Sequence, residues 1–210
     1  VGTLAQLLYL IPSLRGMGPF PISFGFRNRR VRQVLVLMLP VTLGLGLINV
    51  NLTIDTVFAT LVSEEAPRAI DAAFRLYQLP QGIFSVAIST VLFPTIARLS
   101  ARDDVVGMRA TLAGGLRQIF FMLLPASLFL LVMAEPVTRL VFQRGEFDAA
   151  STALTSEALV FFAIGLAFNG ASLLVIRAFF SMQMPWLPTK VALLGVAINV
   201  VLDAALYGPL

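Results

Sequence analysis

Long runs of apolar residues alternate with short polar stretches along the whole chain. About 20 apolar residues in a helix cross a bilayer, and in lipid only a helix of this kind satisfies its own backbone hydrogen bonds. The pattern therefore predicts an all-α fold, a polytopic membrane helix bundle. The expected spans lie at about 1–14, 34–62, 72–97, 110–134, 157–177 and 189–207. We expect the first and the last of these to be truncated and the other four to be complete.

Composition supports a membrane protein and excludes several kinds of chemistry. Hydrophobic residues make up 58% of the chain and charged residues 12%, with a mean hydropathy of +0.91, whereas soluble domains have about 25% charged residues. The chain has no cysteine and no histidine. Disulfides, thiol nucleophiles, imidazole bases and the commonest zinc ligands are therefore excluded. The net charge of +4 is too small to indicate a nucleic-acid partner.

The basic residues predict the orientation of the chain, because cytoplasmic loops carry an excess of Lys and Arg. The stretch 15–33 has five arginines and no acid, 98–117 has four arginines, and 177–190 has one arginine and the only lysine. Acids outnumber basic residues in 63–71 and in 135–156. We therefore expect 15–33, a basic loop, and the other two basic stretches in the cytoplasm, with the two acidic loops facing outward.

Prolines and glycines inside the spans predict bends and close helix contacts. Proline removes a backbone hydrogen bond and kinks a helix, and transporters line cavities with such broken helices, although proline is also generally more frequent in membrane helices. The prolines within spans are Pro40, Pro80, Pro94 and Pro125. Small residues let helices approach closely. The glycines expected to do so are Gly44, Gly46, Gly114, Gly115, Gly165 and Gly170.

Asp55 and Asp203 are carboxylates within the spans rather than at a span end, and a charge at membrane depth by default indicates transport or binding. Asn51 and Asp55 are four residues apart, as are Asn199 and Asp203, so each amide shares a helix face with a carboxylate. If the two helices meet, their oxygens form a cage suited to a hard cation, with Na⁺ or a proton as the natural occupant. The alternative is structural, with Asp55 paired to Arg75 and Asp203 near the membrane interface.

Arg75 lies near the outer start of the span 72–97. Its guanidinium stays charged and offers a fork of donors that matches phosphate. In an internal cavity it would attract a diphosphate or a carboxylate. The alternative is an arginine that extends to the outer lipid headgroups, and the residues alone leave both interpretations open.

Four segments of the chain, in order, resemble the MurJ (MviN) family of lipid II flippases. They are FRLYQLPQG at 74–82 with VLFP at 91–94, LVFQRGEFD at 140–148, AFFSMQ at 178–183 with PTK at 188–190, and NVVLD at 199–203 with GPL at 208–210. They are similar to the family's eighth helix, the loop after the ninth, the link between helices ten and eleven, and helix eleven. The resemblance implies an internal fragment of a fourteen-helix flippase, from the end of helix six to most of helix eleven, in which 34–210 forms helices of the C-terminal lobe.

The resemblance also implies a function. The family moves the undecaprenyl-diphosphate-linked peptidoglycan precursor, lipid II, across the bacterial inner membrane by alternating access, as a transporter and not an enzyme, with sodium or the membrane potential as candidate driving forces. Arg75 would line the central cavity and engage the diphosphate. The sodium ligands would be Asp55, Asn199 and Asp203. No other cofactor is implied.

The implied partners are the lipid-linked precursor, membrane lipids and the remaining lobes of the same protein. Further sodium ligands on helix twelve and the cavity arginines of the N-terminal lobe are absent from these residues, so we expect the fragment not to transport alone. Two alternatives stay open at this point. One is a related exporter of drugs or of a polysaccharide-linked lipid, and the other is an inactive homologue that acts as a membrane scaffold.

Overall fold

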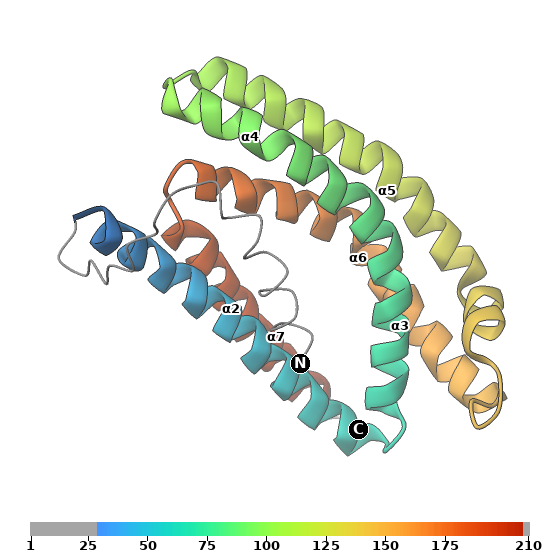
Figure 1. Ribbon diagram of the computed structural model, residues 1–210. Helices are drawn as coiled ribbons and strands as arrows, with labels where there is room; N and C mark the ends of the chain where they lie inside the picture. The colour runs from blue at the N-terminus through green and yellow to red at the C-terminus, as the bar shows by residue number, and fades with distance from the viewer. Residues whose placement is uncertain (1–28, 208–210) are drawn as a thin grey trace, which may run out of the picture. The chain divides into compact units, whose positions relative to one another are not determined.

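A computed structural model describes residues 29–207, and these residues form helices joined by short turns, with no strand among them (Figure 1). The expected helix end at 1–14, most of the basic stretch 15–33 and the terminal GPL lie outside the described residues. The helices are α2 (Arg29–Val62), α3 (Ala66–Pro80), the π-helix η2 (Gln81–Val86), α4 (Ala87–Ala101), α5 (Val105–Phe142), α6 (Ala149–Ser181) and α7 (Trp186–Tyr207).

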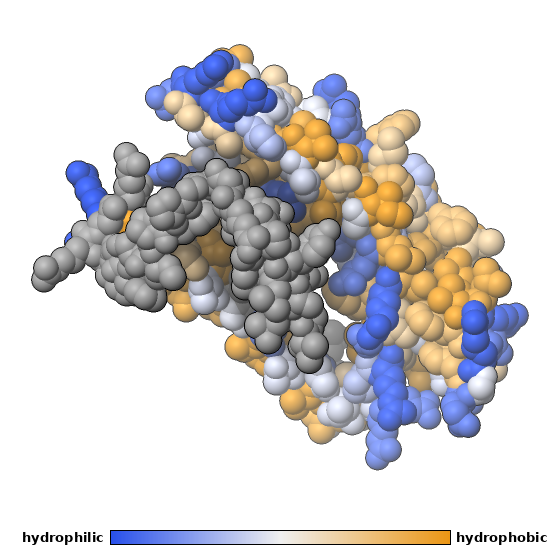
Figure 2. Space-filling view, viewed as in Figure 1, coloured by the Kyte–Doolittle hydropathy of each residue, from blue (hydrophilic) through white to orange (hydrophobic). Residues whose placement is uncertain are grey.

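Five helical stretches in the described part are long and apolar enough to cross a membrane. They are Val34–Leu61, Ala66–Ala101, Val105–Phe142, Ala149–Ser181 and Trp186–Ala205. Large apolar side chains such as Val132, Phe161 and Phe121 point outward from them, and wide apolar areas separate the groups of hydrophilic residues on the visible face (Figure 2). Apolar surface of this extent is what lipid requires. The prediction of an all-α bundle of membrane helices is confirmed.

The helices extend beyond their apolar parts. α2 begins at Arg29, inside the stretch 15–33 that the hydropathy pattern predicts as a loop. α3 begins at Ala66, where the Ser63 hydroxyl accepts the Ala66 backbone N–H at 3.0 Å and Pro67 occupies the first turn. Hydropathy identifies the part of a helix that lies in hydrocarbon, whereas capping groups and prolines set where the helix begins.

Prolines accompany two irregularities in the spans. α3, η2 and α4 form one continuous bent rod (Figure 1), and its π-helical segment starts directly after Pro80. In α5 the backbone leaves helical geometry at Met133, with φ −106° and ψ 17°, just before Pro136. No such departure occurs at Pro125. The lost hydrogen bond and the steric demand of the proline ring fall on the preceding turn, so Pro136 explains the distortion at Met133.

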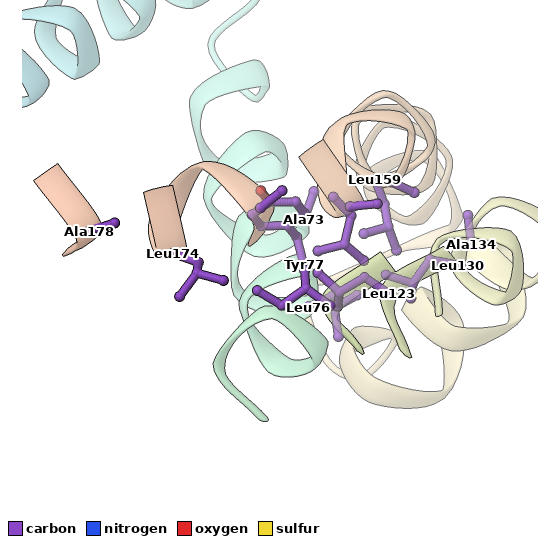
Figure 3. Packing of buried hydrophobic residues seen from close by; sticks show 14 of the residues in the cluster. Ala73, Leu76, Tyr77, Leu123, Leu130, Ala134, Leu159, Leu174 and Ala178 are labelled. Carbon is purple, nitrogen blue, oxygen red and sulfur yellow. The ribbon is translucent and has the colours of Figure 1, made fainter. Parts of the chain in front are cut away.

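The core lies among α3, α4, α5 and α6. Tyr77 and Leu76 of α3 face Leu123 of α5 and Leu159 of α6 (Figure 3). The fully buried leucines and isoleucines of the two long helices recur at helical spacing, at Ile119 and Leu123 on α5 and at Leu159, Leu166 and Leu174 on α6. This spacing places them in one stripe on each helix, so two otherwise apolar helices have a defined contact face.

Two of the six glycines predicted to pack closely do so. A Cβ at Gly115 would overlap the side chains of Leu92 and Leu174, and one at Gly170 would overlap those of Leu123 and Ser85. Gly44 has ordinary space beside Thr189, whereas a Cβ at the other three would meet nothing nearby; these are Gly46, Gly114 and Gly165. Gly115 and Gly170 therefore set how closely α4, α5 and α6 pack.

Candidate functional site

α2 and α7 lie side by side and run in the same direction (Figure 1). The Thr189 hydroxyl, near the start of α7, donates to the backbone carbonyl of Pro40 on α2 at 2.9 Å. Further along, Asn199 of α7 meets Asn51 of α2. Asn51 follows Pro40 by nearly the same number of residues as Asn199 follows Thr189, so the two helices advance equally between the contacts. This alignment brings the polar residues of both helices to one level.

Four polar side chains meet at that level. Asn51 donates its side-chain N–H to Oδ2 of Asp55 at 2.9 Å. With its amide nitrogen turned toward the carboxylates, Asn199 donates to Oδ1 of Asn51 at 3.1 Å, to Oδ1 of Asp55 at 2.9 Å and to Oδ2 of Asp203 at 3.0 Å. All four residues are partly buried. The structure thus brings together Asp55, Asn199 and Asp203, the three residues that the resemblance implies as ligands, and Asn51, which the four-residue spacing places beside Asp55.

Among the residues that the structure describes, the two carboxylates of this cluster have no basic partner. The ion pairs within residues 29–207 join Arg75 to Asp71 and Arg139 to Glu135, so neither carboxylate of the cluster takes part in one. The two carboxylates lie close together, because one amide group of Asn199 lies within 2.9 Å of Oδ1 of Asp55 and 3.0 Å of Oδ2 of Asp203. Like charges at short range repel strongly where water is scarce, so the cluster favours a bound cation or proton.

The donor set limits which cation fits. The cluster offers carboxylate and amide oxygens. Within residues 29–207 there is no group of three or more Asp, Glu, His or Cys side chains that could hold a metal ion. Oxygen donors with two negative charges suit a hard cation rather than zinc or copper. A hard cation therefore fits the donor chemistry of these residues.

Arg75 lies apart from the cluster and has a different partner. Its Nε and Nη2 each donate to Oδ2 of Asp71, one turn earlier on α3, at 3.0 Å. The side chain of Arg75 is 68% exposed and that of Asp71 62%. The ion pair between Asp55 and Arg75, which the sequence left open, is not formed. Arg75 instead presents an accessible guanidinium.

Sequence reasoning missed three polar contacts. The hydrophobic run starts after Asp71 and so predicts a loop position for this residue, although an Asp four residues before an Arg on a helix is a recognisable pair. The other two join distant helices and leave no local signal. Gln81 of η2 donates to Oδ1 of Asn169 on α6, and Arg177 of α6 donates to the Thr90 hydroxyl on α4 at 2.8 Å.

Comparison with known proteins gives consistent matches. The family model described as "Lipid II flippase MurJ" matches residues 1–210. The "Probable lipid II flippase MurJ" of Rhizobium meliloti (strain 1021) is 35% identical over 209 residues, which cover 97% of this chain and 38% of that protein. The "Lipid II flippase MurJ" of Burkholderia cenocepacia is 31% identical over 217 residues, covering 100% of this chain and 42% of that protein. The Vibrio cholerae protein of the same family is 27% identical, with 97% and 39% covered. The chain spans about two-fifths of the length of these curated relatives.

Proposed function

Because the chain belongs to the lipid II flippase MurJ family, we propose that the protein moves lipid II across the bacterial inner membrane. The cargo is a peptidoglycan precursor linked to undecaprenyl diphosphate. The protein acts as a carrier and not as an enzyme, since transport changes the position of the lipid and breaks no bond in it. Support comes from the family match over residues 1–210 and from the five apolar helices.

The observation that carries this proposal is the polar cluster on α2 and α7. Two carboxylates, Asp55 and Asp203, meet on membrane-spanning helices without a basic partner in the described part of the chain. A helix bundle that served only as a scaffold gains nothing from such a pair, because charges at membrane depth are costly. A transporter gains an ion site at the level of the membrane.

Arg75 is the proposed contact for the diphosphate of the lipid. Its guanidinium is accessible, and the planar fork of N–H donors matches two phosphate oxygens at once. The headgroup must cross about 30 Å of hydrocarbon. A cationic chamber offsets part of the hydration that the headgroup loses there, while the isoprenoid tail stays in lipid.

Sodium is the proposed occupant of the cluster, with Asp55, Asn199 and Asp203 as ligands and Asn51 beside them. Asn199 would bind the ion through its amide oxygen, which requires the amide to turn from the orientation in which its nitrogen faces the carboxylates. Bound sodium supplies one positive charge between two carboxylates. Without the ion, Asn51 and Asn199 orient the carboxylates through the N–H groups of their amides. Because α2 and α7 each contribute half of the cluster, an ion bound there would favour the state in which these helices are adjacent. Such a bias drives alternating access only if the ion binds one state more tightly than the other.

The test replaces Arg75 in the full-length protein. We expect Arg75→Ala to abolish growth of a strain depleted of its own lipid II flippase, and to stop lipid II movement in vesicles containing the purified protein. Arg68→Ala, which removes an exposed arginine from the first turn of the same helix, is the matched control and should retain both activities. Unimpaired growth with Arg75→Ala would remove this residue from the substrate site. Vesicles that move a polysaccharide-linked lipid but not lipid II would overturn the proposed function.

A further inference from the structure

A cavity of about 310 Å³ lies between α2 and α3. Asp55 of α2 and Asp71 of α3 both line it, and the rings of Phe74 and Phe162, 5.7 Å apart between centroids, form an apolar wall. Asp55 belongs to the cation cluster, and Asp71 is the partner of Arg75. One cavity therefore touches both the proposed ion site and the residue that neutralises the proposed substrate arginine.

The ion pair between Asp71 and Arg75 is suited to exchange. Oδ2 of Asp71 accepts from both Nε and Nη2 of Arg75 at 3.0 Å, but more than half of each side chain is exposed. Water and mobile ions screen such a pair, so it contributes little to stability. Arg75 can leave Asp71 without disturbing the fold when a stronger anion arrives.

A diphosphate is a stronger partner for Arg75 than Asp71 is. It carries more negative charge, and it offers several oxygens to the guanidinium fork. When it takes over Arg75, Asp71 loses its compensating charge but stays in the wall of the cavity that Asp55 also lines. The cavity then has two carboxylates without a basic partner, and its attraction for a cation increases.

We infer that Asp71 couples the two sites: an isoprenoid diphosphate that binds Arg75 frees Asp71, and the freed carboxylate strengthens Na⁺ binding at Asp55 through the shared cavity. The inference rests on the proposed function, which supplies the anion at Arg75 and the cation at Asp55. Asp71 is a positioning residue, because it acts through Arg75 and through the charge of the cavity. Coupling of binding free energies is reciprocal, so Na⁺ strengthens diphosphate binding by the same factor.

The test measures the Na⁺ affinity of the purified full-length protein with and without farnesyl diphosphate, by equilibrium binding of radioactive sodium. In the wild type we expect saturating farnesyl diphosphate to raise the Na⁺ affinity about fivefold or more. In Asp71→Asn we expect the Na⁺ affinity to increase by less than about twofold, because only the direct attraction between the bound anion and the cation remains. The same variant should bind farnesyl diphosphate more tightly without sodium, because no carboxylate competes for Arg75. A merely structural role for Asp71 would not produce this gain.

Two variants serve as controls. Asp71→Glu keeps a carboxylate at this position and should retain the coupling. Glu64→Gln removes an exposed acid from the turn between α2 and α3 and should leave the coupling unchanged.

Two outcomes separate the coupling from the function on which it rests. In the first, Asp55→Asn abolishes Na⁺ binding and Arg75→Ala abolishes farnesyl diphosphate binding, yet the two ligands bind independently or Asp71→Asn couples as the wild type does. The inference is then overturned while the proposed function stands. In the second, the wild type fails to bind one of the two ligands, and the proposed role of the sodium cluster or of Arg75 falls together with the inference, while lipid II movement is tested separately in vesicles.

Discussion

The side chain of Asn199 on α7 contacts Oδ1 of Asp55 on α2 at 2.9 Å. The contact closes a small polar cluster between two helices that are far apart in the chain. Asn199 also reaches Asp203, one turn further along its own helix. One amide thus bridges two carboxylates that would otherwise repel each other. A cation bound between Asp55 and Asp203 would reduce the remaining repulsion and so stabilise the cluster.

Sodium should stabilise the full-length protein through this cluster. A ligand that binds only the folded state at 100 times its Kd adds about 2.7 kcal/mol to the free energy of unfolding. We therefore expect Na⁺ to raise the Tm of the wild type in detergent. Asp55→Asn removes one of the two charges that attract the ion, so the shift should be lost. Thermal unfolding followed by tryptophan fluorescence or circular dichroism measures the effect.

Potassium at equal concentration controls for ionic strength, and Glu64→Gln controls for the loss of one negative charge elsewhere. We expect Glu64→Gln to show the wild-type shift. An equal shift with both ions, or an undiminished shift in Asp55→Asn, would assign the cluster to helix packing alone.

Gly170 should tolerate no side chain. A Cβ at this position would overlap the side chains of Leu123 and Ser85, and both are fully buried, so their displacement would disturb the surrounding core. Overpacking of this kind costs about 1–3 kcal/mol, so Gly170→Ala should lower the free energy of unfolding by that amount. Gly165 lies on the same helix at an exposed position, with open space where a new Cβ would be. Gly165→Ala is therefore the matched control. Equal stability of the two variants, measured by reversible unfolding in mixed micelles, would contradict the packing role.

Asp148 should stabilise α6 in a way that depends on pH. Its Oδ1 accepts the backbone N–H of Ser151 at 2.8 Å at the start of the helix, and this hydrogen bond holds the pKa of the Asp148 carboxyl below its ordinary value of 3.8. Because the pKa is lower in the folded than in the unfolded protein, the stabilisation is complete above about pH 4 and is lost as the pH falls through the folded pKa. Asp148→Ala should therefore lower Tm at neutral pH, and its difference from the wild type should shrink in acid.

Asparagine at position 148 separates capping from titration. Asp148→Asn retains a side-chain oxygen for the Ser151 N–H but cannot ionise, so its Tm should stay near that of the wild type at neutral pH. A deficit of Asp148→Ala that is the same at neutral and at acidic pH would show that the carboxylate charge plays no part.

Gln81 and Asn169 should be energetically coupled. The amide of Gln81 in η2 donates to Oδ1 of Asn169 on α6, which ties the irregular part of its span to a neighbouring helix. Hydrogen bonds between membrane helices contribute about 0.6 kcal/mol on average and up to about 1.7. A double-mutant cycle of Gln81→Ala and Asn169→Ala should give a coupling energy in this range. The same cycle with Gln78→Ala, at an exposed position of α3, should be additive, and additivity in both cycles would rule out the bond.

Much of this protein follows from local sequence. Each span is an apolar run long enough to cross a bilayer, and the burial of such a run does not depend on which helix lies next to it. The pairing of Asn51 with Asp55 is equally local, because residues four apart share a helix face in any helix. For the same reason the pairing of Asp71 with Arg75 was available in the sequence, and only the late start assigned to the span concealed it.

Tertiary structure decided which faces meet. Nothing in the apolar pattern distinguishes Gly170, which packs against Leu123, from Gly165, which faces open space, because lipid and protein present similarly apolar surroundings to a helix. Likewise, α7 lies against α2 through Thr189 and Asn199, and this contact alone brings Asp203 to Asp55. The carboxylates could be named from the sequence, but their meeting depends on the packing of two distant helices, which no local pattern encodes.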